Sequence, residues 1–502
     1  MAKLLRPLLS ALALPLSLAA LALFSQGRWP WYAVLLTAVL YAATLQSLPG
    51  LRRRPPLYTA SMLYLALGLV LPPLGHILGL AGQRWFWLLI SFGVEIGIAL
   101  VIWVWIRPRF VKPGAVRLGT TTGLRRPVEI SPDDRFLHLH VLGPTGSGKT
   151  VGVLGPLVRQ DIRMGNGVLL LDPKGDLWEY ARREAERAGR KAVALSPKED
   201  PAVGIDLFAG PPEQAAETVA YALYGAFPSG HEFYRTVGQA MLRNAAQAVK
   251  EARPEATLQD LEDFLQSEDA RRDMLLQARS KHVRTYFRDQ VGGWSPRFRQ
   301  DAFVGVQSAV AQLTANPWAR SLFSARPAYD FDQLLSEGGM LLLALPEGEM
   351  GLAARAVGSF ALLLFQAAAL RRTAGGKPAF VYADEFQTFA QPGFAAFLAE
   401  ARSHRVGAVL AHQHLGQLDK ELRAAVLSNA RNRVLLGGLS QQDLEQLRDS
   451  LGHRFVSSER GLREAPRFDY ETLRRMPRGE AVAEIAAGGQ LLPPVHLRLP
   501  RP

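Results

Sequence analysis

The distribution of hydrophobic and polar positions divides the chain into two unlike parts. Over residues 1–112, apolar side chains form four long and almost uncharged stretches, at 8–24, 29–48, 57–80 and 85–106. Each stretch is close to the roughly 20 residues that an α-helix needs to cross a bilayer. After residue 112 the apolar runs are shorter and alternate with charged segments. We therefore predict a transmembrane anchor of about four helices at 1–112, followed by a part that lies outside the bilayer.

The charges between these stretches predict how the anchor is oriented. Lysine and arginine cluster before the first stretch, after the second and after the fourth, whereas Arg28 and Arg84 stand alone after the first and the third. The dense clusters fall on one side of the bilayer, which the positive-inside rule places in the cytoplasm. No clear cleavage site follows the first stretch, so we interpret it as a retained anchor rather than a signal peptide. Both ends of the anchor are expected in the cytoplasm.

The amino-acid composition excludes several kinds of functional site. The chain has 58 Lys and Arg residues against 45 Asp and Glu, a net charge of +13. Much of this excess lies in residues 1–112, where Glu95 is the single acidic residue, so the net charge does not indicate DNA binding. The chain has no cysteine, which excludes disulfides, thiolate metal sites and cysteine catalysis.

From residue 136 onward, short apolar runs alternate with helical patterns. The runs predict buried strands near 136–142, 167–172, 191–195, 339–345, 379–383 and 406–411. This alternation predicts an α/β fold whose mostly parallel sheet is covered on both faces. Residues 113–135 are polar and rich in Gly, Thr and Pro, and we interpret them as a connector. We expect a nucleotide-binding domain in two parts, 113–210 and 331–502, around an all-α domain at 211–330.

A glycine-rich loop after the first of these strands predicts phosphate binding. It matches G-x-x-x-x-G-K-[ST] with Gly143, Pro144, Thr145, Gly146, Ser147, Gly148, Lys149 and Thr150. The glycines allow backbone N–H groups to surround a phosphate at the start of the following helix. Lys149 can reach the β- and γ-phosphates, and the Thr150 hydroxyl can bind Mg²⁺. The motif predicts a nucleoside triphosphate site, with ATP and Mg²⁺ as the expected ligands.

An acidic pair ends the apolar run at 379–383. Asp384 and Glu385 follow this strand, and carboxylates at a strand end are common in themselves. Downstream of a phosphate-binding loop, however, the pair predicts that Asp384 holds Mg²⁺ through its water shell. Glu385 is then placed to orient and deprotonate the attacking water.

Two further polar residues flank the next predicted strand, one at each end. Gln413 follows the strand at 406–411, where ATPases with an additional strand sense the γ-phosphate; the alternative is a surface turn residue. Arg402 precedes the same strand, and its guanidinium could stabilise charge in a neighbouring subunit. Arg405, Arg431 and Arg433 are further candidates for this role, and an ordinary surface arginine is the alternative in each case.

Residues 271–299 contain many more basic than acidic side chains, interleaved with Tyr286, Phe287, Trp294 and Phe298. Such a patch could grip a phosphate backbone and stack bases. It could equally be a solvated helix surface with aromatic residues in the core. The sequence leaves both interpretations open.

With these motifs in order, the chain resembles the TraG/TraD-like type IV secretion (conjugative) coupling proteins. The resemblance is carried by LGPTGSGKTVGVLGPL, LLLDPKGDLWEY, FVYADEFQTF and ARSHRVGAVLAHQHLGQLDKELRAAVLSNARNRVLLGG, and by the closing run YETLRRMPRGEAVAEIAAGGQLLPPVHL. It implies a RecA/FtsK-like P-loop ATPase fold and a ring, expected to be a homo-hexamer, anchored in the bacterial inner membrane with its motor in the cytoplasm. The four predicted spans depart from the pair often seen in that family.

The resemblance also implies partners and roles. The expected partners are DNA, single-stranded and with a relaxase attached, and the proteins of a type IV secretion channel. Lys149 and Thr150 correspond to Walker A, Asp384 and Glu385 to Walker B, and Arg402 to the arginine that acts in trans. Two other functions remain open. One is a duplex DNA pump of the FtsK/HerA type, and the other is a receptor for secreted protein effectors that uses ATP as an assembly switch.

Overall fold

The computed structural model describes residues 113–500, except 124, 227–231, 373–375, 392, 448–450 and 459–460. The predicted membrane spans at 1–112 lie outside the described residues. Within the described part, the helix Leu352–Arg371 (α17) is long and apolar enough to cross a bilayer. Of the most apolar window of α17, 78% is buried inside the protein. The buried side chains of α17 belong to the main hydrophobic core. We therefore interpret α17 as a core helix.

The described residues form an eleven-stranded sheet in the order β2-β1-β15-β12-β9-β3-β8-β7-β4-β6-β5. Every pairing from β9 through β3, β8, β7, β4 and β6 to β5 is parallel, and the pairings from β9 to β12 and on to β2 are antiparallel. The predicted α/β fold with a mostly parallel sheet is confirmed. The bounds are β1 Val116–Thr121, β2 Pro127–Ile130, β3 Leu139–Leu142, β4 Gly167–Asp172, β5 Val193–Leu195, β6 Met340–Ala344, β7 Ala379–Ala383, β8 Val406–His412, β9 Asn432–Leu436, β12 Glu480–Glu484 and β15 Val495–Arg498.

The central strands are apolar at almost every position because helices cover both faces of the sheet. In β4, Val168 and Leu170 join the core under α6 and α7, while Leu169 and Leu171 point into the core that contains α17. Alternate residues of one strand thus supply two cores, as the two-residue period of a strand requires. The helices around the sheet are α6 Gly155–Met164, α7 Asp176–Arg187, α15 Phe331–Glu337, α16 Glu347–Met350, α18 Phe394–Glu400, α19 Lys420–Asn429 and α20 Gln441–Gln446.

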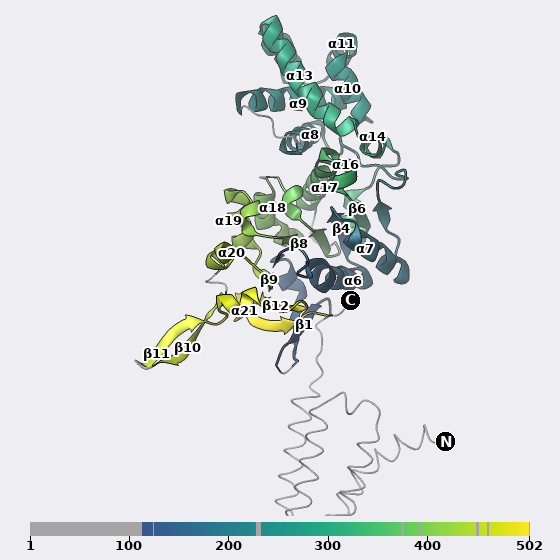
Figure 1. Cartoon of the computed structure of the whole chain (residues 1–502). Coiled ribbons are helices and arrows are strands. Elements are labelled where there is room, and N and C mark those ends of the chain that lie inside the picture. The colour runs from purple at the N-terminus through teal and green to yellow at the C-terminus, as the bar shows by residue number, and fades with distance from the viewer. Residues whose placement is uncertain are drawn as a thin grey trace, which may run out of the picture. The chain divides into compact units, whose positions relative to one another are not determined.

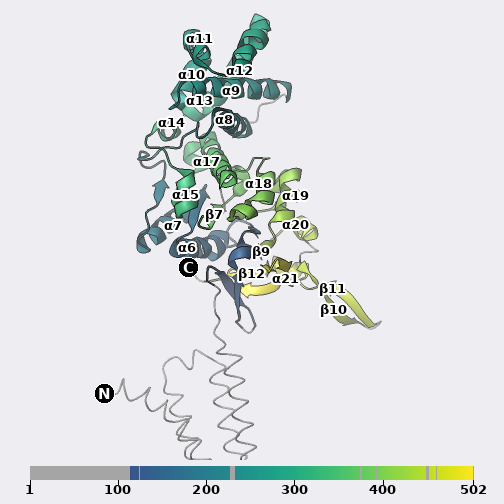
Figure 2. The same cartoon turned by 180° about the vertical axis from the view of Figure 1, so that it is seen from behind.

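A group of helices separates β5 from β6 in sequence. They gather at one end of this part of the protein, next to α17, in both views (Figures 1 and 2). No strand element lies between 211 and 330 among the described residues, although one isolated bridge pairs Gly204 with Ala328. The predicted domain boundaries stay a prediction. The helices are α8 Pro212–Ala226, α9 Glu232–Ala252, α10 Leu258–Gln266, α11 Glu268–Gln277, α12 Lys281–Thr285, η2 Tyr286–Val291, α13 Pro296–Thr314 and α14 Pro317–Ser324.

The connector predicted at 113–135 is wrong. This segment forms β1, β2 and the short helix Pro132–Arg135 (α5), and β1 pairs with both β2 and β15. The expected strand at 136–142 begins only at Leu139, because Phe136 closes the α5 turn and His138 has a left-handed φ of 57°. The residues of β1 alternate irregularly between buried and exposed positions, which explains the weak strand signal.

The C-terminal region adds elements that the hydrophobic pattern did not predict. A hairpin of β10 (His453–Ser458) and β11 (Gly461–Pro466) extends away from the sheet (Figures 1 and 2). The closing run that carries part of the family resemblance forms α21 (Tyr470–Arg474), β12 and β15. Between them, β13 (Ala486–Ala487) and β14 (Gln490–Leu491) form a small separate ribbon.

A buried ionic cluster joins α5, α6 and β7. The Arg135 guanidinium donates to both carboxylate oxygens of Asp161, at 2.5 and 2.6 Å, and stacks on the Phe380 ring at 3.5 Å. The Tyr382 hydroxyl and the Asn166 amide also donate to Asp161. Burial would lower the pKa of Arg135, but Asp161 outweighs it and the pKa is raised. The helix that follows the loop is therefore fixed to the sheet by a charge pair with several hydrogen bonds.

Candidate nucleotide-binding site

Three neighbouring strands bring the predicted site residues to one edge of the sheet. Strand β8 lies between β3 and β7 and is parallel to both, so the carboxyl ends of all three point the same way. The phosphate-binding loop follows β3, Asp384 and Glu385 follow β7, and Gln413 follows β8. Ligands of open α/β sheets bind outside the carboxyl ends of the strands. Leu142, just before the loop, lies opposite His412, just before Gln413. The structure thus brings together site residues that are far apart in the sequence.

The loop has the backbone that its glycines predict. Gly146 and Gly148 have φ values of 78° and 100°, which L-residues with side chains rarely adopt. The chain then winds into one wide turn, Lys149–Leu154 (η1), which continues as α6. The Ser147 hydroxyl oxygen is buried and has no hydrogen-bond partner among the described residues. A buried polar atom without a partner at a helix start fits a loop shaped to receive an anion.

Lys149 supplies a buried positive charge in this loop. Its side chain is 5% exposed, and its ammonium group donates to the carbonyl oxygens of Gly143 at 2.6 Å and Pro144 at 3.4 Å. Its Nζ lies 4.0 Å from a carboxylate oxygen of Glu385. Burial lowers the pKa of Lys149, although Glu385 and Asp384 oppose this shift. A phosphate beside this ammonium group would stabilise its charged form.

Thr150 and Asp384 form the oxygen-rich side of the site. The Thr150 hydroxyl donates to a carboxylate oxygen of Asp384 at 2.9 Å. Burial raises the pKa of Asp384, and this hydrogen bond opposes the rise. No group of three or more His, Asp or Glu side chains suited to a metal occurs among the described residues. These oxygens fit Mg²⁺, which proteins usually hold with one or two carboxylates, waters and phosphate oxygens.

Glu385 is held as a charged group by three donors. Lys174 and Gln413 each donate to its Oε1 at 3.0 Å, and Gln387 donates to its Oε2 at 3.1 Å. Burial would raise the pKa of Glu385, but these hydrogen bonds and the charge of Lys174 lower it. Its backbone has φ 48°, a left-handed conformation that is costly for a residue with a side chain. Glu385 is thus a fixed and charged carboxylate.

Three residues in or beside the site were not predicted as site residues: Lys174, Gln387 and Arg478. Lys174 lies in the LLLDPKGDLWEY run, just after β4, where Asp172 accepts hydrogen bonds from the backbone N–H groups of Lys174 and Trp178, each at 2.9 Å. Gln387 lies two residues after Glu385. Arg478, before β12, lies beside Gly148, with its Cγ 3.9 Å from where a Cβ atom would stand. All three lie in runs that carry the family resemblance, but nothing within those runs marked them as site residues.

Arg402 lies at the other end of β8. It belongs to the turn Ala401–His404 (η4), which directly precedes β8, whereas Gln413 directly follows it. The strand Val406–His412 spans about 20 Å at roughly 3.3 Å per residue, so Arg402 cannot reach the phosphate-binding loop of its own chain. Arg402 and Arg405 are exposed and line a cavity of about 490 Å³ with Asp133 and Asp134.

The other arginine candidates differ in their surroundings. Arg433 is 10% exposed and pairs with Glu484 at 2.9 Å. Burial lowers the pKa of Arg433, and Glu484 opposes this shift. Arg431 lies just before β9 and is half-buried. Arg402 and Arg405 therefore remain the exposed candidates.

The aromatic residues of the basic stretch 271–299 separate into two groups. Phe287 is 7% exposed and packs against Phe264 in the helical core, with ring centroids 5.2 Å apart. Trp294 and Phe298 pack edge to face and continue to Phe233, which is 55% exposed. The core interpretation therefore holds for Phe287, and the others form a partly exposed cluster.

Comparisons with known proteins agree with this architecture. The trigonal form of the bacterial conjugative coupling protein TrwBdeltaN70 with sulphate has a TM-score of 0.59 and 19% identity, over 76% of this chain and 89% of that chain. The plasmid coupling protein TrwB in complex with ADP and Mg²⁺ has a TM-score of 0.58 and 18% identity over the same shares, 76% and 89%. At this identity the likeness shows the fold. A search of curated proteins found no match.

A comparison of the sequence with family models identifies the family of this chain. The family model described as type IV secretory system conjugative DNA transfer matches residues 116–454, which is more than half of the chain and includes every predicted site residue. The chain belongs to the type IV secretory system conjugative DNA transfer family.

Proposed function

We propose that this protein is a membrane-anchored, ATP-driven DNA translocase that couples a relaxase-bearing DNA to a type IV secretion channel. Its family membership supports a role in conjugative DNA transfer. The observation that carries the proposal is the meeting of Lys149, Glu385 and Gln413 at one edge of the sheet. A charged carboxylate with a buried cation on one side and an amide in hydrogen-bond contact supplies the parts that phosphoanhydride hydrolysis requires.

ATP and Mg²⁺ are the proposed ligands of this site. Gly143–Thr150 would hold the phosphates, and Thr150 and Asp384 would hold the metal ion, which neutralises phosphate charge when bound. Lys149 balances charge on the terminal phosphate, and Glu385 accepts a proton from the attacking water at its carboxylate. Gln413, already in contact with Glu385, orients the same water. A bound ADP and Mg²⁺ occur in a TrwB structure of the same fold.

We further propose a ring of six subunits in which Arg402 acts on the neighbouring site. Its position at the opposite end of β8 from Gln413 supports this role, because one subunit would then offer its loop and the next its arginine. Stabilisation of transition-state charge by an arginine in trans is well established for P-loop enzymes.

Membrane attachment through 1–112 is part of the proposal. Residue 1, the loop at 49–56 and the chain after 107 are expected in the cytoplasm, and the loops near 25–30 and 81–84 on the opposite side. Reporter fusions in each loop test this topology. A fusion near Gly50 that reports the non-cytoplasmic side would contradict the four-span arrangement.

ATPase assays with the full chain in lipid nanodiscs test the function. We expect single-stranded DNA to stimulate hydrolysis more than duplex DNA does, and Glu385→Gln to abolish the stimulated rate. Stimulation by duplex alone would indicate a pump of the FtsK/HerA type. ATP hydrolysis that no DNA changes would reject the translocase and leave the receptor for protein effectors.

A further inference from the structure

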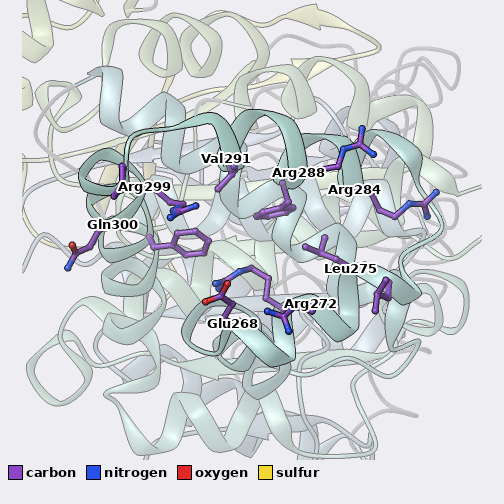
Figure 3. Close-up of a pocket in the computed structure, with 14 residues that line it drawn as sticks. Glu268, Arg272, Leu275, Arg284, Arg288, Val291, Arg299 and Gln300 are labelled. Carbon is purple, nitrogen blue, oxygen red and sulfur yellow. The ribbon is translucent and has the colours of Figure 1, made fainter.

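The helical part contains an open cavity bordered by arginines, here called the arginine cleft. Its volume is about 710 Å³, and α11, the α12–η2 segment and α13 line it. In Figure 3 the labelled side chains of these helices surround a common opening. Five arginines border it: Arg271, Arg272, Arg284, Arg288 and Arg299. Glu268 is the one acidic residue of its lining.

Part of this positive charge is not neutralised within the cleft. Arg272 approaches Asp269 at 3.6 Å, but both side chains are largely exposed, at 68% and 93%, so this pair is weak. Arg284 donates to backbone carbonyls, which leave its charge intact. Arg288 does pair with Asp289, at 2.6 Å. Among the described residues, Arg299 makes no ion pair.

The walls of the cleft are aliphatic where a ligand could enter. Leu276 is 77% exposed, the highest value among the large apolar residues whose exposure is described, and Leu275 is half-buried beside it. Val291 and Pro296 face the same cavity. Apolar side chains in open water with arginines around them are typical of an interaction surface.

The cleft is poorly suited to nucleic acid. Base stacking needs an open aromatic face, but Phe287 is 7% exposed and the Arg271 guanidinium covers the Phe303 ring at 4.5 Å. A phosphate backbone could pair with the arginines, yet it would leave Leu275 and Leu276 in water. A ligand must therefore carry apolar groups and negative charge together.

We propose that the arginine cleft binds an acidic amphipathic peptide segment of a partner protein. Aliphatic side chains of the peptide pack on Leu275 and Leu276, and its carboxylates pair with Arg272, Arg284 and Arg299. A helix with apolar residues at positions i, i+3 and i+4 and acidic residues between them presents both groups on adjacent faces. The proposal goes beyond ATP-driven DNA movement, because it assigns a protein-binding site that does not depend on the nucleotide site.

A fluorescein-labelled peptide provides the test. It has about two heptads of leucine at helical spacing with glutamate and aspartate elsewhere, and its anisotropy is measured with the full chain in nanodiscs of anionic lipid, with empty nanodiscs as the blank. We expect saturable binding that Arg272→Glu/Arg299→Glu weakens by about tenfold, because two attractions become repulsions. Leu276→Ser should weaken it by about fivefold. Arg320→Glu, at an exposed position of α14 outside the cleft, is the matched control and should change little.

Several results would overturn the proposal. These are no saturable binding, equal affinity for the double variant, or equal affinity for a peptide in which serine replaces every leucine. A thymidine oligonucleotide that binds more tightly than the peptide and loses binding in the same variants would assign the cleft to nucleic acid instead. If the double variant fails to fold, Arg272→Gln/Arg299→Gln, which removes charge without adding acids, replaces it in the same comparison.

Discussion

The Lys174 ammonium group lies 3.0 Å from a carboxylate oxygen of Glu385, and the two residues follow neighbouring strands, β4 and β7. Lys174 is 44% exposed, whereas Glu385 is 7% exposed. The burial of Lys174 would lower its pKa, but the hydrogen bond to Glu385 and the charge of that carboxylate raise it. A partly solvated cation thus joins Gln387 and Gln413 in stabilising the charge of the proposed general base.

The pH dependence of hydrolysis should reveal this contribution of Lys174. Lys174 helps to lower the pKa of Glu385, so Lys174→Met should raise that pKa. Because Glu385 acts as the carboxylate, the variant should lose activity at a higher pH than the wild type as the solution is acidified. The measurement is kcat against pH from neutral into the acid range, with exposed Lys191→Met as the control. An unchanged acid limb would show that Lys174 does not set the charge of Glu385.

Substitutions of Lys149 and Glu385 should separate nucleotide binding from hydrolysis. Lys149→Ala removes the buried ammonium group beside the loop and should abolish hydrolysis. Glu385→Gln keeps a side chain of the same size but cannot accept the proton, so it should bind ATP and lose about 10²–10⁴ in kcat. Binding is measured with a fluorescent ATP analogue and turnover by phosphate release. Near wild-type turnover in Glu385→Gln would mean that another group is the base.

Arg402→Ala should leave nucleotide affinity largely intact and reduce hydrolysis by roughly 10³–10⁵. The reason is its position before β8, remote from the loop of its own chain. Mixing Arg402→Ala with Lys149→Ala tests action in trans, because some interfaces then combine an intact arginine with an intact loop. Returned activity supports a shared site. Mixed rings without activity would transfer the role to Arg405, which lines the same cavity, or to Arg431 or Arg433.

Asp161→Ala should destabilise the protein by about 3–5 kcal/mol, because Arg135 would remain buried without its counter-charge. The side chains of Arg135 and Asp161 are 4% and 0% exposed. Thermal unfolding should show a midpoint several degrees lower. Arg183→Ala, which breaks an exposed pair with Glu179 (63% and 33% exposed), is the control and should cost less than about 1 kcal/mol. Equal shifts in the two variants would contradict the importance of the buried cluster.

The sequence predicted those features whose residues are contiguous. Eight consecutive residues, Gly143–Thr150, specify a loop conformation and a chemistry together, and the structure has the expected glycine backbone there. The almost entirely apolar strands β4, β6 and β7 could be predicted from the sequence because both of their faces are buried. Their order in the sheet was not predicted, because it depends on pairing between segments that are far apart in the sequence.

Other features depend on contacts between distant positions. Lys174 and Glu385 are 211 residues apart, and nothing in either segment states that β4 and β7 are neighbours. Arg478 reaches Gly148 from beyond the entire helical part. The strand β1 was missed because only its tertiary pairing with β15 and β2 makes a polar segment extended.

The separation of Gln413 and Arg402 by the length of β8 has a consequence for assembly. A surface that must meet the opposite surface of another copy cannot be satisfied by a symmetric pair, in which identical patches face each other. If Arg402 acts on the neighbouring site as proposed, each contact between subunits is head to tail, and such contacts either close into a ring or continue as a filament. An isolated subunit is then silent, so specific activity should rise steeply with protein concentration. The proposed ring is also directional. Each subunit contacts one neighbour through its nucleotide site and the other neighbour through Arg402, so a change in one site affects its two neighbours through different contacts.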